Sequence, residues 1–154
     1  GIARQEGQAR NRVGHVLLAM KRWEEAYDAY GKALAVWEPL QHPNRYEAIA
    51  GRSLAAWHCG KNDEALALAQ EAVAFVREQG SSGLVEPALL LLNCYRVLHA
   101  ADQKQSARWA LERAGQWVET IAGRISSETV RNAFLRRPDN REVQRLLAAV
   151  GAQV

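Results

Sequence analysis

The chain has 154 residues, a net charge of +3, 48% apolar residues and 24% charged residues. These values are ordinary for one globular domain with a substantial core, and they argue against a disordered or fibrous chain. The two cysteines are too few for a disulfide framework, and the sequence has neither a secretion signal nor an apolar stretch long enough to span a bilayer. We therefore expect a reduced, cytoplasmic protein without membrane contact.

An apolar pattern recurs three times along the chain, at nearly even intervals. Each copy begins with an alanine and has small or apolar residues four and seven positions later, on one stripe of a helix. An apolar pair that contains an aromatic residue follows at ten and eleven positions, so Trp37 and Trp117 are expected in the core. The members are Ala26, Tyr30 and Ala33, then Ala65, Ala69 and Ala72, then Ala107, Leu111 and Ala114.

A second helix is expected before each stripe, so that each unit forms a helical hairpin. The units span about residues 7–40, 43–80 and 85–123. Gly60 marks the turn within the second unit, whereas the first turn has no glycine. Gly80 is expected as a helix C-cap in the left-handed conformation, and Pro87 near the start of the next helix. No segment of useful length has the two-residue period of a strand.

The tail, residues 126–154, does not follow the repeat. Ser126 or Ser127 is expected to cap a helix that carries Val130 and Phe134. A last helix follows Pro138 and bears four further apolar residues, which are Val143, Leu146, Leu147 and Val150. A stack of hairpins leaves an apolar face on its final unit, so these amphipathic helices are expected to cap it.

The first unit resembles the tetratricopeptide repeat, a helix–turn–helix unit, in its Gly14, Leu17, Ala26, Tyr30 and Ala33. The third unit departs from the pattern because Tyr95 stands where a small residue is expected, which predicts looser or shifted packing there. The resemblance implies an all-α fold, a right-handed superhelical stack of three hairpins over residues 1–125, followed by C-terminal capping helices over 126–154.

The tail also has a more particular likeness. Its segments 130–135 and 138–143 are similar to the C-terminal end of repeat regions in large bacterial signalling and transcription-regulatory proteins with an NTPase module. This resemblance implies that the chain is the interaction or sensor end of such a protein, and a first residue Gly1 in place of Met agrees with a fragment. The sequence contains no phosphate-binding loop of its own.

The residues that carry chemistry are not arranged as a catalytic or metal site. The four histidines lack the close ligand spacing of a metal site, and the cysteines lack a C-x-x-C partner. Acidic pairs such as Glu24-Glu25 and Asp63-Glu64 suit the first turns of helices. We therefore expect no enzyme activity, no metal and no cofactor.

The tetratricopeptide resemblance implies that the first helix of each hairpin lines a concave groove. The groove candidates on these helices are Asn11, His15, Leu18, Leu54, Trp57, Asn93, Arg96 and His99. They lack the set of cations that would clamp a C-terminal carboxylate, so the expected partner is an extended or helical apolar peptide with one acidic residue near Arg96. Trp57 is the expected aromatic anchor. The partner is another protein or another domain of the same chain.

Two alternatives stay open at this point. The stretch from Lys104 to Arg145 holds nine basic and five acidic residues, so the tail helices could form an accessory nucleic-acid surface. Its arginines are Arg131, Arg136, Arg137, Arg141 and Arg145. The chain could also be a stand-alone adaptor, and its first unit, which has no cap, could mediate self-association.

Overall fold

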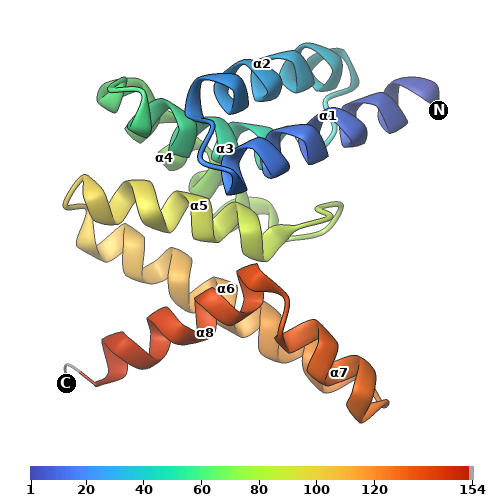
Figure 1. The fold of residues 1–154 in the computed structure, drawn as a ribbon, viewed down its shortest axis with the longest axis vertical. Coiled ribbons are helices and arrows are strands. Elements are labelled where there is room, and N and C mark those ends of the chain that lie inside the picture. Colours follow the sequence, from blue (N-terminus) through green and yellow to red (C-terminus); the bar gives the residue numbers. More distant parts are fainter. Residues whose placement is uncertain (153–154) are drawn as a thin grey trace.

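The computed structural model describes residues 1–152, which form eight α-helices and contain no strand (Figure 1). The helices are α1 (Ile2–Ala19), α2 (Trp23–Leu40), α3 (Arg45–His58), α4 (Asn62–Gln79), α5 (Pro87–Ala100), α6 (Lys104–Arg124), α7 (Glu128–Leu135) and α8 (Pro138–Gly151). The predicted fold class, an all-α stack of helical repeats, is confirmed. No helix within residues 1–152 is both long enough and apolar enough to cross a membrane.

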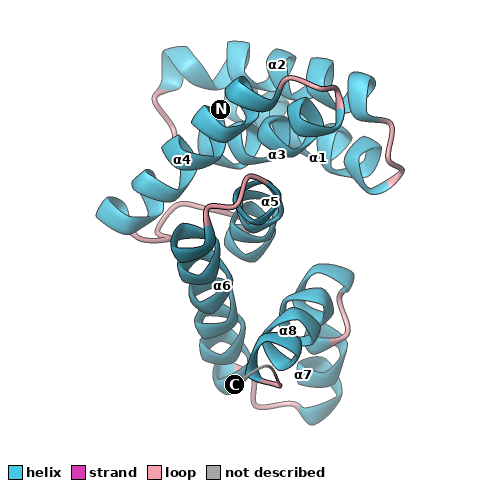
Figure 2. Cartoon of the chain, turned by 90° about the vertical axis from the view of Figure 1, so that its left-hand side faces the viewer, coloured by secondary structure: helices cyan, strands magenta, loops and turns pink. Residues whose placement is uncertain are grey.

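The first six helices pair as three consecutive hairpins, α1–α2, α3–α4 and α5–α6, each packed on the one before (Figures 1 and 2). All nine residues of the repeated stripe are buried, and they lie on the second helix of each hairpin. Seven of these nine are alanines, and a small side chain lets the paired helices approach closely. The alanine pattern therefore forms the centre of the core.

The three hairpins turn in the same way. Lys21, Gly60 and Asp102 all have positive φ angles, of 58°, 79° and 58°, and each precedes the first alanine of its stripe by the same number of positions. In each turn the next residue donates its backbone N–H to a carbonyl five positions earlier, as Arg22 does to Leu17 over 3.0 Å. This pattern is the Schellman motif. The first turn thus adopts the left-handed conformation without the glycine that would favour it.

The predicted helix boundaries between the second and third hairpins are largely confirmed. Helix α5 begins at Pro87, whose fixed φ suits the first helical position. Gly80 has positive φ, but its φ and ψ of 73° and −159° lie outside the left-handed helical region. That combination is available almost only to glycine, so the chain leaves α4 in an extended direction.

Two large aromatic side chains of α2 fill space that glycines leave open. Tyr30 is fully buried between Gly14 of α1 and Gly51 of α3, and Trp37 is fully buried against Gly7. A Cβ atom added to any of these glycines would come within 3.0 Å of the aromatic ring. In the third hairpin Tyr95 occupies the position of Gly14, and Leu111 occupies the position of Tyr30.

The tail helices pack on the last hairpin. Ser127 caps α7 by accepting a hydrogen bond from the backbone N–H of Val130 over 3.3 Å, as the sequence predicts. Trp117 is only half-buried, against the expectation that it belongs to the core, because it lies at the edge of α6 beside Phe134 of α7. Helix α8 folds back over α6 and α5, where its Val143 is fully buried. Residues 153–154 of the predicted cap lie outside the described residues.

Candidate binding groove

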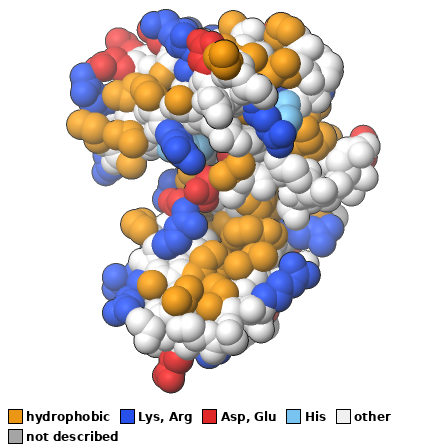
Figure 3. Space-filling view, turned by 90° about the vertical axis from the view of Figure 1, so that its right-hand side faces the viewer, with side chains coloured by type: hydrophobic (Ala, Val, Ile, Leu, Met, Phe, Trp, Pro, Cys, Tyr) orange, Lys and Arg blue, Asp and Glu red, His pale blue; other side chains and the backbone are white. Residues whose placement is uncertain are grey.

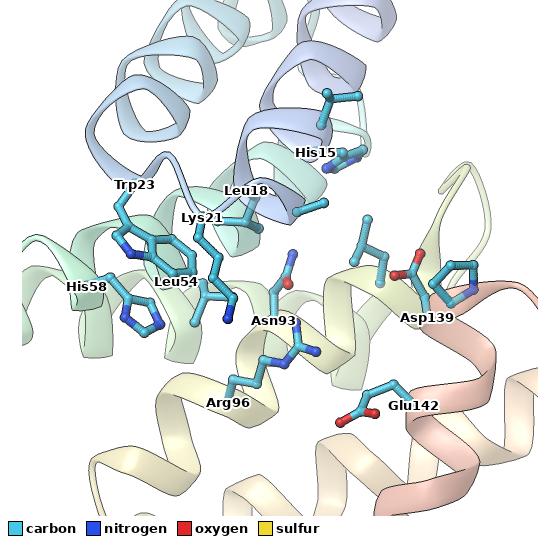
Figure 4. A pocket seen from close by; sticks show the side chains of 14 residues that line it. His15, Leu18, Lys21, Trp23, Leu54, His58, Asn93, Arg96, Asp139 and Glu142 are labelled. Atoms are coloured by element: carbon cyan, nitrogen blue, oxygen red, sulfur yellow. The ribbon is translucent and has the colours of Figure 1, made fainter.

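The concave side of the stack holds a groove of about 750 Å³. Helices α1 and α3 form one side, α5 forms the floor, and the start of α8 forms the other side (Figure 2). The space-filling view shows the same hollow at the waist of the molecule, where basic and acidic side chains meet (Figure 3). Its central lining residues are His15, Leu18, Lys21, Trp23, Leu54, His58, Asn93, Arg96, Asp139 and Glu142 (Figure 4).

One end of the groove is apolar and aromatic. Leu18 of α1 and Leu54 of α3 are nearly buried and contribute to both the core and the groove wall. Beside them the indole of Trp23 stacks on the imidazole of His58, with 3.8 Å between the ring centres and 11° between the planes. An apolar ligand side chain would find a flat aromatic surface and two leucines here.

Asn93 lies on the floor of the groove, and its side-chain amide is fully buried without a hydrogen-bond partner within the described residues. Both its oxygen and its nitrogen are unpaired there. Most buried polar atoms in proteins are hydrogen-bonded, and an unpaired one is destabilising. Figure 4 shows this amide directed toward the space between α1 and α5. The groove floor therefore holds one amide whose donor and acceptor are both unused within the described residues.

The long walls of the groove carry opposite charges. Lys21, from the first turn, and Arg96, from α5, point into the groove, and neither forms an ion pair within the described residues (Figure 4). Asp139 and Glu142 face them from α8. Burial, followed by the charges of Arg96 and Lys21, lowers the pKa of His58. His58 is therefore neutral at pH 7, and the positive charge of this wall belongs to Lys21 and Arg96.

Five of the eight predicted groove residues line this groove, namely His15, Leu18, Leu54, Asn93 and Arg96. The other three lie elsewhere. Trp57 is half-buried against the core, and the aromatic position in the groove belongs to its neighbour His58 and to Trp23. His99 is exposed at the end of α5 and stacks on Tyr95, with 5.4 Å between the ring centres.

Asn11 is the third predicted groove residue that lies elsewhere, and its side chain links parts of the core. Its amide nitrogen donates to the carbonyl of Asn44 over 3.1 Å, and its oxygen accepts from the indole nitrogen of Trp37 over 3.1 Å. The side chain is buried, and it joins the first hairpin to the start of the second. Both polar atoms of this amide have a partner within the protein, and Asn11 does not line the main groove.

A buried polar cluster lies behind the groove wall. The hydroxyl of Tyr30 lies 2.7 Å from Nδ1 of His15, and Nε2 of the same imidazole is 3.9 Å from Glu47. Burial, followed by the charges of Glu47 and Asp139, raises the pKa of Tyr30 well above its usual value. Tyr30 therefore stays a neutral phenol, and this cluster positions His15 at the rim of the groove.

The arginines of the tail are largely engaged within the protein. Arg131 donates to the carbonyl of Ile125 over 2.9 and 3.1 Å, and Arg137 donates to Glu86 over 2.9 and 3.1 Å. Arg145 pairs with Glu142. The other two, Arg136 and Arg141, lie beside a depression at the junction of α7 and α8. These arginines do not form one continuous basic stripe.

Within residues 1–152 we find no group of three His, Cys, Asp or Glu side chains that could hold a metal ion. Burial raises the pKa of both thiols, that of Cys94 far above its usual value, and near Cys59 the charge of Glu24 adds to this effect. A thiol with a raised pKa is a poor nucleophile at neutral pH, so neither cysteine is set up for covalent chemistry.

Residues 5–78 match the family model of the tetratricopeptide repeat. This range runs from α1 into α4 and covers the first two hairpins. Comparisons with curated proteins and with solved structures gave no significant match. The match supports a tetratricopeptide repeat family, whose repeats generally mediate interactions between proteins.

Proposed function

We propose that the chain is a non-enzymatic interaction domain that binds a segment of another protein, or of another domain of its own chain, in the concave groove. The observation that carries this proposal is the amide of Asn93, which is buried in the groove floor without a partner among the described residues. A peptide backbone offers the complementary donor and acceptor, so a bound segment would satisfy an amide that the free protein leaves unpaired. Leu18, Leu54 and Trp23 supply apolar contact area beside it.

The replacement Asn93→Leu tests this proposal, because leucine has the same branching and number of side-chain heavy atoms but no polar group. We expect the variant to be more stable than the wild type by about 1–3 kcal/mol, since an unpaired buried amide is removed. We also expect about tenfold weaker binding to peptides selected by display against the wild-type protein. Urea denaturation and fluorescence polarisation would measure the two effects.

Asn11→Leu is the matched control, because Asn11 is also a buried asparagine but is hydrogen-bonded to Asn44 and Trp37. Here we expect a loss of stability of about 1–3 kcal/mol, since two partners lose their bonds. Opposite signs for the two asparagines would support a ligand-directed amide at Asn93. Unchanged peptide affinity in a folded Asn93→Leu variant would reject the proposed role of the groove.

The proposal has three further parts. The chain consists of repeats over 1–125 and a cap over 126–154, it belongs to a larger bacterial regulatory protein, and that protein is cytoplasmic. The hairpin order and the likeness of segments 130–135 and 138–143 support it. An antibody blot of source-cell lysate tests it. A band several times larger than 17.1 kDa is expected, whereas a band near that mass would favour a stand-alone adaptor.

The nucleic-acid alternative has less support. Four of the five tail arginines are engaged in intramolecular hydrogen bonds or ion pairs, namely Arg131, Arg136, Arg137 and Arg145. Acidic residues lie among them, and phosphate binding would require a continuous basic surface. A gel shift at low salt is expected to show no complex.

Self-association through α1 is supported by a comparison of equivalent positions. In α3, Arg52 stacks over the ring of Tyr27, at 4.1 Å from the ring centre, and so faces α2 of the preceding hairpin. The equivalent position of the first repeat, in α1, is Val13, which is 53% exposed. Val16 and Met20 continue the same face of α1 and are 58% and 57% exposed. These three side chains are therefore largely uncovered, and Val16 also borders the groove.

We expect the wild-type chain to associate through this face, and Val13→Glu, which lies outside the groove, to abolish the association, because a carboxylate would have to be buried between two copies. Sedimentation equilibrium over a range of concentrations would measure the apparent mass. Val130→Glu is the control, since Val130 is 55% exposed on α7, away from α1. A wild-type mass that stays monomeric at all concentrations would contradict the expectation.

A further inference from the structure

The two walls of the groove differ in origin as well as in charge. Lys21 and Arg96 come from the turn and the floor of the hairpin stack, whereas Asp139 and Glu142 come from the first turns of α8. Helix α8 is held in place by Val143 in the core and by the ion pair of Arg137 with Glu86. The cap therefore supplies a fixed acidic wall that the repeats themselves do not contain.

The charges of the two walls do not neutralise each other directly. Within the described residues, Lys21 and Arg96 have no ion pair within 4.0 Å, and Asp139 has no ion pair or side-chain hydrogen bond. Glu142 is bonded to Arg145 over 2.6 and 2.8 Å, yet its carboxylate also lies close enough to Arg96 for the guanidinium to help lower its pKa. Opposite charges thus face each other across the groove, and those of Lys21, Arg96 and Asp139 remain available to a ligand (Figure 4).

We propose that the groove selects a peptide segment with two opposite charges, an acidic side chain placed between Lys21 and Arg96 and a basic side chain placed against Asp139. This inference rests on the proposed function, and it adds the partner's charge pattern and the role of α8 as a specificity wall. The backbone between the two charged side chains crosses Asn93, whose amide donates and accepts. A segment with only acidic charge would leave Asp139 facing it, and like charges in one site are unfavourable.

Asp139 is half-buried, so solvent screens its charge less than it would screen the charge of a fully exposed residue. It lines the groove beside Pro138, and after burial and the charge of Glu47 its charge makes the smallest contribution to the raised pKa of Tyr30. A charge that is felt by a buried group is poorly screened by solvent. The same field would act on a basic side chain of a ligand in the groove.

An array of N-acetylated, C-amidated nonapeptides tests the inference. The peptides share an alanine and leucine background and carry one Glu, one Lys, both or neither, with one to four residues between the two charges. We expect peptides with both charges at the best spacing to bind about fivefold more tightly than peptides with Glu alone, the effect of one partly exposed ion pair. Capped ends ensure that terminal charges do not contribute.

Asp139→Asn should remove this fivefold advantage and leave the affinity for peptides with Glu alone unchanged or slightly higher. Asp63→Asn is the matched control, because Asp63 also lies in the first turn of a helix but outside the groove, and it should change neither affinity. Arg96→Gln should weaken every peptide that carries Glu.

The possible results separate the two proposals. If no peptide of the array or of the display selection binds, the proposed function fails, and this inference fails with it. If peptides bind but those with both charges gain nothing, or if their advantage survives Asp139→Asn, the groove binds peptides and α8 does not select their charge. That result would overturn the inference alone.

Discussion

Gly51→Ala is expected to destabilise the protein by about 2 kcal/mol, although alanine is the better helix former. In an open helix the same change would stabilise by about 1 kcal/mol. At position 51 of α3, however, a Cβ atom would come within 3.0 Å of the ring of Tyr30, which is fully buried and bonded to His15. The ring has no free space to move into, because Gly14 of α1 lies against it as well. Overpacking of this kind costs about 1–3 kcal/mol, and the gain in helix propensity of about 1 kcal/mol offsets part of that cost.

Gly123→Ala provides the comparison within the same fold. Gly123 is helical in α6, and a Cβ atom there would meet nothing within 4 Å. This variant should gain about 0.5–1 kcal/mol, and urea denaturation of both variants measures the difference in sign. A stabilising effect of Gly51→Ala would mean that Tyr30 is not tightly enclosed between the first two hairpins.

The repeated alanine stripe made the fold predictable, because its helical spacing and its regular recurrence fix which faces of the helices meet. The reciprocal fit of Tyr30 with Gly51 was not predictable from the pattern. The two residues belong to different hairpins, and only the way one hairpin stacks on the next brings them together. The conformation of the first turn was also not predictable. Lys21 has a positive φ angle there, whereas among the three hairpin turns only the second has a glycine, Gly60, that indicates such a conformation.

The groove was predictable in part for the same reason. His15, Leu18 and Leu54 were found because the first helix of each hairpin shows one face to the concave side. Trp57 was misplaced relative to the groove by one residue, which is a rotation of about 100° around a helix, and His58 lies there instead. Asp139 was not found, because no period links the tail to the repeats and only the return of α8 over α5 brings it to the groove.

Glu47→Ala is expected to destabilise the protein by about 3 kcal/mol or more, because one carboxylate joins all three hairpins. Glu47 of α3 is buried, and its Oε2 accepts hydrogen bonds from the backbone N–H groups of Val85 and Glu86, over 2.6 and 2.9 Å, just before α5. Its Oε1 lies 3.9 Å from the imidazole of His15 on α1. Alanine would remove the charged acceptor from both partly buried N–H groups, and that of Val85 would keep only its longer bond to Asn44, over 3.2 Å. A hydrogen bond to a charged group contributes about 1.5–3 kcal/mol.

Glu47→Gln separates the hydrogen bonds from the charge. A glutamine oxygen in the place of Oε2 can still accept from both N–H groups but carries no charge, so the loss should be about half of that for alanine. Glu78→Ala, at an exposed position near the end of α4, should change the free energy of unfolding by less than about 0.5 kcal/mol. If Glu47→Ala unfolds at the wild-type urea concentration, then the apolar contacts of α3 with α5 hold the second and third hairpins together without this carboxylate. The expected loss of stability would instead identify Glu47 as the polar link between the hairpins. A less firmly held α5 should also weaken peptide binding at Asn93, and the affinity of display-selected peptides would measure this effect.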